Sequence, residues 1–557
     1  MGFFSSRKKK GHEYVYYEER AWKDGKVIRS FQKYLGPRDW FPDELFGKHK
    51  VLTPDDYETE TFTFGLSAAL WQIAQELNLE QVFNSALGKP SHANIGSYLL
   101  LTAINRLVAP CSKTELFDWF QTDWISIQVP EKRCLLNARV HWDLCQDLTS
   151  DDFEKIELEM GKLLQEKYGL SHDQLLYDTT NIFTYAAPDG PGGLRNNGHS
   201  KQNQNDLPLI QYYLLCSKPW GFPLLHYTYT GNTQDAETFK TVPAKVTDHW
   251  HQLGYDPANI TLTFDKGNLS PEGFKELDAR KLKFIASLRN STQKALLQRP
   301  LSDFTTVTLP VSKKQVEYLQ ETRKIYEKNR TVLVVIDPAK KKKHCIKFEA
   351  KLAKKQATLQ DFIDYQLNIK KWRNKDSVEK KIATMIGKRP WKSVLIPTIQ
   401  GDEGQITVTI DVDLNAKQQY ENTLGKSILF TNLKGHDPSD LIWSYREQYL
   451  IERAFSLMKD PQTIAIRPIF VSNPQSIEGH IFICIIALWL LALLRYKLCQ
   501  KGIAVSYDQI VRDLRRVHVT RVHILPTNSS FLKLDKVPAR MTKYIALLHL
   551  DALIKEG

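Results

Sequence analysis

The 557-residue sequence predicts an α/β fold in which a mixed sheet with flanking helices is interrupted by a β-rich insertion and preceded by a β-hairpin and a helical domain. Three observations support this prediction. Apolar residues recur at helical spacing from position 63 to 168, short buried runs begin at 174, and those runs then alternate with helical patterns. This alternation is typical of a sheet that is covered by helices.

The first 170 residues divide into two predicted regions. Residues 14–35 alternate between apolar and polar and contain the turn Lys23-Asp24-Gly25-Lys26, which predicts a β-hairpin arm within 1–60. Residues 61–170 carry apolar residues at three and four spacing. We interpret them as a helical domain and as a candidate DNA-binding region.

A mixed-sheet domain is predicted over 171–300 and 426–500. Its first part has the predicted order β-β-β-α-β-α-β, with one strand ending at Asp178 and the fourth running into Asp265. Residues 301–425 break that order with short β-like runs and a lysine-rich helical stretch, so we interpret them as a basic β-rich insertion. Residues 501–557 are predicted to form a basic C-terminal region.

Composition limits the function. The formal net charge of +13 and the pI near 9.1 favour an anionic partner, and nucleic acid is the commonest one for a large folded protein; a solvated basic surface is the alternative. Seven cysteines stand singly, without the paired spacing of zinc sites, which predicts a reducing compartment. The apolar run 481–494 is too short to span a bilayer and predicts a core helix. We therefore expect a cytoplasmic, nucleoid-associated protein without a membrane partner.

The most informative segment is 444–460. Tyr445, Glu452 and Lys459 stand seven residues apart, and two helical turns are close to seven residues, so the spacing predicts one helix that presents all three on one side. The opposite side is apolar and is predicted to pack against the core; it comprises Leu450, Ile451, Ala454, Leu457 and Met458.

Three carboxylates are candidates for one metal site. Asp178, Asp265 and Glu452 are predicted to meet at one edge of the mixed sheet, where their mutual repulsion would require cations. Oxygen ligands suit Mg²⁺ or Mn²⁺, and two such ions can promote phosphoryl displacement. Alternatives remain open at each position, because Asp178 and Asp265 suit a cap or a turn, and Glu452 suits a salt bridge with Lys459 or Arg453.

These residues resemble a known family. Tyr177-Asp178-Thr179-Thr180, Phe264-Asp265-Lys266-Gly267 and the segment from Tyr445 to Lys459 are similar to motifs of the DDE transposases of prokaryotic insertion sequences. The closest subgroup in pattern carries the signature Y-x-x-R-x-x-x-E-x(6)-K. The resemblance implies a ribonuclease-H-like catalytic domain with an inserted β-rich domain, and it covers roughly residues 170 to 500.

One position departs from the signature, because Gln448 stands where the subgroup has arginine. Glutamine can donate a hydrogen bond to phosphate, but it brings no charge and no bidentate fork. Arg446 cannot replace it, since it lies about 160° away around a helix. The departure predicts a weaker hold on the end of the DNA.

The resemblance implies DNA contacts for a further set of residues. Tyr445 and Lys459 correspond to contacts with the DNA end, although a solvated tyrosine and lysine are common on helices. Asp235 suits either support of the metal site or a cap for the helix that follows it, and we favour the cap. Trp372 and Trp391 lie among the lysines of the insertion, a mixture that suits stacking on an unpaired base but is also found on solvated faces. The complete predicted DNA-binding set is Tyr445, Gln448, Lys459, Lys201, Trp372 and Trp391.

The function that the resemblance implies is that of a DNA transposase. It would cut double-stranded DNA at the ends of an element and join those ends to target DNA, with two Mg²⁺ (or Mn²⁺) ions held by Asp178, Asp265 and Glu452, and it would act as a homodimer on DNA. Two alternatives stay open. One is a non-catalytic DNA-binding protein derived from such an enzyme, and the other is a stand-alone metal-dependent nuclease.

Overall fold

The computed structural model describes residues 2–23, 26–41, 45, 56–88, 94–469, 471–525 and 528–554. The chain forms two compact units, and each is assembled from separate segments. Unit 1 comprises Met1–Leu170, Thr179–Asn232 and Glu452–Gly557, and unit 2 comprises Ser171–Asp178 and Thr233–Ile451. Strand β5 (Gln174–Phe183) is divided between them, so the predicted mixed-sheet region contributes to both units.

Unit 1 contains two small antiparallel sheets. In the first, β1 (Gly2–Lys9), β2 (His12–Lys23) and β3 (Lys26–Pro37) pair in the order β1-β2-β3. The two central residues of the predicted turn, Asp24 and Gly25, lie outside the described residues. In the second, β4 (Tyr57–Thr63) pairs with β16 (His518–Ile524), which pairs with β17 (Ser529–Leu534). The C-terminal region therefore shares a sheet with the end of the predicted N-terminal arm.

The described residues between 65 and 168 are mainly helical. The helix that ends this region, α7, begins with a reciprocal capping box in which Thr149 and Asp152 satisfy each other's backbone N–H groups. The helices are α1 (Gly65–Glu76), α2 (Leu79–Leu87), α3 (Ile95–Val108), α4 (Leu116–Gln121), α5 (Ile125–Gln128), α6 (Ala138–Cys145) and α7 (Ser150–Tyr168).

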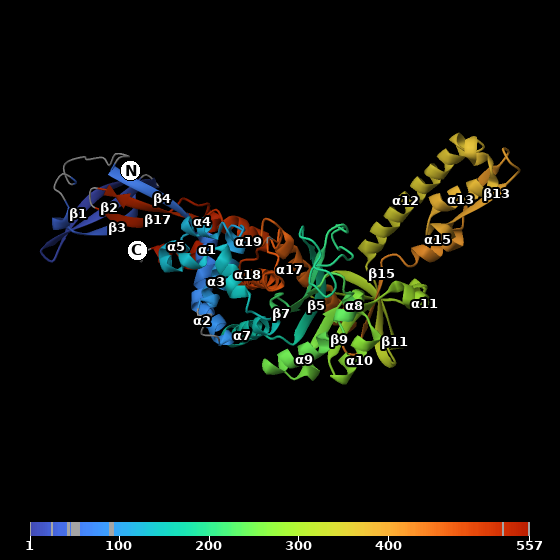
Figure 1. Ribbon diagram of the computed structural model, residues 1–557, viewed down its shortest axis with the longest axis horizontal. Coiled ribbons are helices and arrows are strands. Elements are labelled where there is room, and N and C mark those ends of the chain that lie inside the picture. Colours follow the sequence, from blue (N-terminus) through green and yellow to red (C-terminus); the bar gives the residue numbers. More distant parts are fainter. Residues whose placement is uncertain are drawn as a thin grey trace. The chain divides into compact units, whose positions relative to one another are not determined.

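The core of unit 1 is built around α18 (Pro474–Gln500), which contacts α1, α3 and α6 (Figure 1). Among the described residues it is the one helix that is long and apolar enough to cross a membrane, with a mean hydropathy of 2.4. However, 94% of its most apolar window is buried inside the protein, which is typical of a core helix. Other elements of unit 1 are β6 (Leu209–Ser217), β7 (Pro223–Thr230), α17 (Tyr449–Lys459), α19 (Tyr507–Leu514) and α20 (Ala539–Leu547).

Unit 2 contains a large mixed sheet with the order β10-β11-β12-β15-β9-β8-β5. The pairs β5–β8 and β8–β9 are parallel, whereas the remaining pairs are antiparallel. Its further strands are β8 (Thr261–Phe264), β9 (Lys283–Leu288), β10 (Thr305–Thr308), β11 (Gln315–Ile325), β12 (Lys328–Ile336) and β15 (Lys426–Thr431). Its helices include α8 (Asp235–Thr238), α9 (Val242–Gln252), α10 (Pro271–Ala279), α11 (Lys294–Leu297) and α16 (Pro438–Arg446). The predicted order β-β-β-α-β-α-β is confirmed along the chain, with α8 and α9 in place of a single helix.

The insertion differs from its prediction in two respects. Residues 305–336 form strands that pair with β15, so they belong to the large sheet, and the extra segment begins near 337. That segment is mainly helical, because its lysine-rich stretch forms the long helix α12 (Pro338–Tyr365). The rest consists of α13 (Lys375–Ile386), α14 (Trp391–Val394), α15 (Leu414–Glu421) and the hairpin of β13 (Leu395–Gln400) with β14 (Thr407–Val412).

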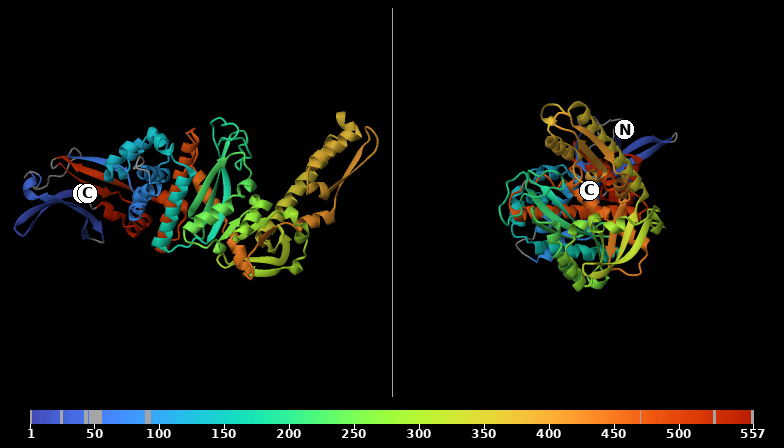
Figure 2. Two further views of the ribbon diagram at one scale, coloured as in Figure 1. Left: turned by 60° about the horizontal axis from the view of Figure 1, so that its bottom comes forward. Right: turned by 90° about the vertical axis from the view of Figure 1, so that its right-hand side faces the viewer.

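The insertion has its own hydrophobic core, which contains buried residues such as Phe348, Phe362 and Ile382. In Figures 1 and 2, α12, α13, α15 and β13 lie together, in agreement with this shared core. The insertion is therefore a small packed body with a basic surface.

Candidate active site

Two of the predicted catalytic residues stand side by side in unit 2. β5 and β8 are parallel and pair Tyr177 with Phe264, so the next residues, Asp178 and Asp265, occupy matching positions on neighbouring strands. Both strands are buried up to this point, and both aspartates are half-buried. β5 continues to Phe183, five residues beyond the predicted end, but its pairing with β8 stops at Tyr177.

The Asp265 carboxylate is held by two hydroxyl groups. Ser287 Oγ donates a hydrogen bond to Asp265 Oδ1 at 2.6 Å, and the Tyr445 hydroxyl donates to the same oxygen at 3.1 Å. Ser287 Oγ also accepts from the backbone N–H of Lys266 at 3.1 Å. The serine therefore fixes both the carboxylate and the backbone that follows it.

Ser287 is a residue that sequence reasoning missed. The parallel pairing of Phe264 with Ala286 places Ser287 beside Asp265 in the neighbouring strand. The residue is 6% exposed. Only the register between β8 and β9 could have identified it, and one sequence does not reveal that register.

Tyr445 reaches this site from α16. That helix packs against the large sheet through Leu441 and Ile442, and the Tyr445 ring packs against the same hydrophobic cluster. The apolar contacts thus place the tyrosine hydroxyl at the end of β8, where it meets Asp265.

A cavity of about 540 Å³ adjoins Asp265 and Tyr445 within unit 2. Arg446 also lines it and forms an ion pair with Asp337 at 2.9 Å. Burial opposes ionisation of Asp337, but the hydrogen bond from the Lys340 N–H and the Arg446 charge outweigh it and lower the pKa of that carboxyl. The other charged or ionisable lining residues are Lys266, Lys340, His344 and Lys426, so the cavity wall is mainly basic.

The helix predicted around Tyr445, Glu452 and Lys459 is not continuous. Tyr445 lies near the end of α16, whereas Glu452 and Lys459 lie in the first and last turns of α17. Gln448 lies between the two helices and is only 6% exposed, so it does not stand on an open helix face as the spacing predicted. Its backbone N–H donates to the Tyr445 carbonyl at 3.1 Å, which closes the turn.

α17 keeps the predicted division into an apolar and a polar side. Ile451, Ala454, Leu457 and Met458 are buried, as predicted, and the Glu452 side chain is exposed. The neighbouring Arg453 pairs with Asp508.

Two lysines in unit 1 converge on the residues that follow Asp178. Lys201 Nζ donates to both the carbonyl and the hydroxyl oxygen of Thr179, each at 2.7 Å. Lys459 Nζ donates to the hydroxyl of Thr180. Lys201 comes from a loop and Lys459 from α17, so two cationic side chains flank β5 at this point.

Two further predictions concern residues outside this group. Trp391 stacks on Phe348 with ring centroids 5.2 Å apart, and Trp372 meets Phe362 edge-on, so both tryptophans are partly buried against the core of the insertion. Asp235 is the first residue of α8 and not its cap, because Gln234 occupies that position. A Cβ placed on Gly267 would lie 3.7 Å from Asp235 Oδ2, so this carboxylate adjoins the turn after Asp265.

The donor atoms fit a hard divalent cation. Asp178 and Asp265 offer carboxylate oxygens at one sheet edge, without thiolate or imidazole ligands, and such donors suit Mg²⁺ or Mn²⁺. Over the part of the chain that the structure describes, no three His, Cys, Asp or Glu side chains are grouped closely enough to hold a metal ion. The third predicted ligand, Glu452, belongs to unit 1.

Comparison with known proteins gives one family match. The model for the transposase DDE domain matches residues 221–490, a range that contains Asp265 and Glu452 and begins after Asp178. No curated protein matches the sequence.

A solved structure, the cryo-EM structure of a piggyBac transposase synaptic complex with hairpin DNA, is similar over 82% of this chain and 82% of that chain. The sequence identity is 8% and the TM-score is 0.37, too low to define a common fold. The family match therefore covers somewhat less than half of the chain, and within residues 221–490 the sequence is similar to a transposase DDE domain.

Proposed function

We propose that the chain is a DNA transposase that cuts the ends of a transposable element and joins them to target DNA. The observation that carries the proposal is the matching position of Asp178 and Asp265 on parallel strands, in a chain whose residues 221–490 match a transposase DDE domain. The strand order of unit 2, with parallel β5, β8 and β9, supports a ribonuclease-H-like sheet.

Asp178, Asp265 and Glu452 would hold the divalent ions of the proposed site, and we propose two ions, Mg²⁺ or Mn²⁺. Bound ions would supply Lewis acidity and neutralise the charge that develops on phosphate oxygens. Ser287 and Tyr445 orient the Asp265 carboxylate through their hydroxyl groups. Their task is to keep this ligand in one position before DNA arrives.

The bond changes at the DNA are two successive displacements at phosphorus. In the first, a water oxygen bonds to phosphorus, the P–O3′ bond breaks, and the water proton ends on the released 3′ hydroxyl. In the second, the oxygen of that hydroxyl bonds to a target phosphorus, the target P–O3′ bond breaks, and the hydroxyl proton ends on the displaced 3′ oxygen. Lys201 and Lys459, which donate hydrogen bonds to Thr179 and Thr180 of β5, would bind phosphate oxygens during these steps, and Tyr445 would contact the DNA end.

The remaining predicted DNA contacts, Gln448, Trp372 and Trp391, are uncharged, and none of them is fully exposed. Gln448 is buried, so the uncharged residue at the signature's arginine position is withdrawn from the surface. Trp372 and Trp391 would contact an unpaired base only at the edges that the insertion core leaves uncovered. Cutting paired ends together requires a homodimer on DNA.

The test is cleavage of a plasmid that carries the DNA flanking the gene on both sides, with Mg²⁺. Asp265→Ala and Glu452→Ala should each abolish cleavage while DNA binding persists, because they remove ligands and leave the basic surface intact. Glu379→Ala is the matched control, since Glu379 is an exposed acid on α13 away from these residues. Cleavage by both site variants at the wild-type rate would refute the assignment.

The same assay separates the alternatives. Joined products in a second plasmid identify a transposase, whereas cuts without joining identify a stand-alone nuclease. Binding of the flanking DNA without any cut by the wild-type chain would identify a non-catalytic DNA-binding protein.

A further inference from the structure

One carboxylate in the N-terminal sheet gathers three arginines. Glu18 on β2 is 1% exposed and pairs with Arg7 from β1, with Arg20 at 3.5 Å and with Arg29 from β3 at 3.5 Å. The arginine side chains remain 47%, 53% and 43% exposed, respectively. Three guanidinium groups face one carboxylate, so the cluster keeps an excess of two positive charges that reach solvent.

The opposite side of this sheet is already covered. Tyr17 and Phe31 contact Phe531 of β17 with ring centroids 5.2 Å and 5.3 Å apart, and Glu19 pairs with Lys533 at 2.7 Å. Successive side chains of a strand point to opposite faces, so Tyr17 and Glu19 point toward β17 and Glu18 points away. The arginines are therefore held on the side of the sheet that faces away from β17.

Aromatic rings accompany the arginines. Tyr16 and Tyr34 lie opposite one another on β2 and β3 with ring centroids 5.6 Å apart, and the Arg7 guanidinium lies 5.4 Å from the Tyr16 ring centroid. Near the end of β2, Trp22 is 76% exposed. We call the side formed by Arg7, Arg20, Arg29, Tyr16 and Tyr34 the arginine face.

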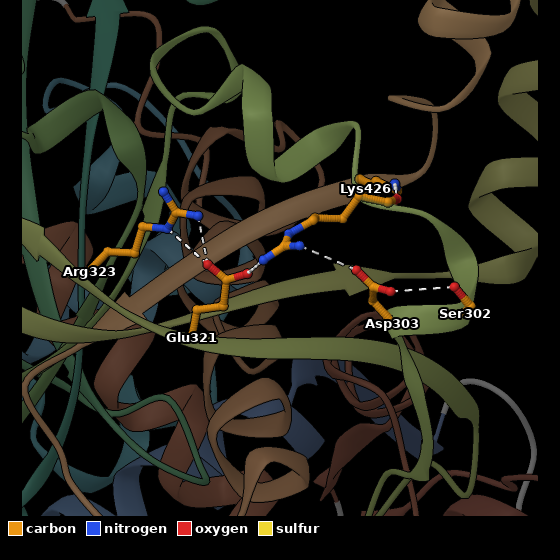
Figure 3. Close-up of polar contacts among 6 residues, drawn as sticks. Ser302, Asp303, Glu321, Arg323 and Lys426 are labelled. Atoms are coloured by element: carbon orange, nitrogen blue, oxygen red, sulfur yellow. Dashed lines mark hydrogen bonds and ion pairs between the residues drawn. The ribbon is translucent and has the colours of Figure 1, made fainter.

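A second arginine cluster shows what a charge-balanced arrangement looks like in this chain. In Figure 3, Glu321 on β11 faces Arg323, and Asp303 lies nearby. Arg299 pairs with both Glu321, at 2.6 Å, and Asp303, at 3.5 Å. Two arginines here meet two carboxylates, so the pairs neutralise each other and leave no excess charge.

We propose that the arginine face binds the phosphate backbone of duplex DNA. Guanidinium groups recognise phosphate oxygens bidentately, and a net positive, partly exposed cluster with flanking aromatic rings suits a phosphate track. Glu18 keeps the three groups together so that they present their free N–H donors in one place. The partner follows from the proposed function, but the surface lies in a separate sheet and does not include the candidate catalytic residues.

The test is the salt dependence of binding to a labelled mixed-sequence duplex. Each phosphate contact contributes about 0.9 to the slope of log affinity against log salt. Arg20→Gln with Arg29→Gln should reduce that slope by about 2, which makes the loss of affinity between 50 and 200 mM salt roughly tenfold smaller. Arg20→Lys with Arg29→Lys should retain most of the slope, because the charges remain.

The matched control is Arg299→Gln with Arg323→Gln. These side chains are 46% and 36% exposed, close to the values of the tested pair, but their charges are balanced, so the slope should stay at the wild-type value. Thermal unfolding of each variant verifies that the sheet is intact.

The outcomes distinguish this inference from the proposed function. An unchanged slope in the Arg20 and Arg29 glutamine variant would overturn the inference, and normal cleavage by that variant would leave the proposed function standing. An equal loss in the control pair would also overturn it, since the effect would then follow total charge. Failure of the wild-type chain to bind any duplex would overturn both.

Discussion

Replacing Ser287 by alanine tests whether Asp265 needs a fixed orientation. The change removes the 2.6 Å hydrogen bond to Asp265 Oδ1 and leaves the Lys266 N–H without its 3.1 Å acceptor. A hydrogen bond to a charged group contributes about 1.5–3 kcal/mol, which corresponds to a factor of roughly 10 to 150. Loss of a residue that orients a metal ligand typically weakens metal affinity or activity by about 10- to 100-fold, in the same range.

The assay is titration of Mn²⁺ into the protein, followed by calorimetry, and into the cleavage reaction. Ser287→Ala should raise the metal concentration needed for half-maximal cleavage by about 10- to 100-fold, with a smaller change in the rate at saturating metal. Ser270→Ala is the matched control. Ser270 is also 6% exposed, and its hydroxyl accepts from the Gly273 N–H at the start of α10, so its loss affects stability without touching Asp265.

A wild-type metal titration in Ser287→Ala would refute the reasoning, because it would mean that the carboxylate keeps its position without the serine. A shift of equal size in Ser270→Ala would refute it as well, since the effect would then reflect general destabilisation.

Three other predictions follow from described contacts. Tyr445→Phe removes the 3.1 Å hydrogen bond to Asp265 but keeps the ring in its hydrophobic cluster. Cleavage should therefore slow roughly two- to tenfold, with unchanged thermal stability. A loss of cleavage activity as large as that of Asp265→Ala would contradict a positioning role. Lys459→Met should lower the slope of log DNA affinity against log salt by about 0.9. Lys167→Met, which replaces an exposed lysine at the end of α7, should leave that slope unchanged. Equal slopes in the wild type and both variants would argue against a phosphate contact at Lys459. Asp123 is fully buried, and burial raises its pKa from 3.8 to about 6. Its protonated form therefore stabilises the fold below pH 3.8, and this contribution is lost as pH rises through 6, at about 1.4 kcal/mol per pH unit or about 3 kcal/mol in all. The free energy of unfolding of Asp123→Asn, measured in urea, should lack this decline, and a decline like that of the wild type would assign it to another group.

The sequence was sufficient to predict the order of the strands and the positions of Asp178 and Asp265. Continuous apolar runs mark buried strands, and an acidic residue that follows such a run marks the point where the strand leaves the core. The apolar side of α17 was predictable for the same reason, because burial leaves a periodic pattern.

The break between α16 and α17 was not predictable. No proline or glycine stands between Tyr445 and Lys459, and the turn at Gln448 closes through backbone hydrogen bonds that carry no sequence pattern. Tryptophans among lysines suggested an open surface, but composition does not reveal which side of each helix meets Phe348 or Phe362. Ser287 depended on strand register, which one sequence does not specify.

The assembly of unit 1 from distant segments has a consequence for its synthesis. Helices α1 and α3 pack against α18, which begins at Pro474, so their apolar sides have no partner until most of the chain has been made. At about 5 to 20 residues per second, the interval between Val108 and Pro474 amounts to roughly 20 to 70 seconds of translation. During that time the nascent helical region exposes apolar surface that favours aggregation. A chain truncated before Pro474 would expose the same surface permanently, and we expect it to be insoluble.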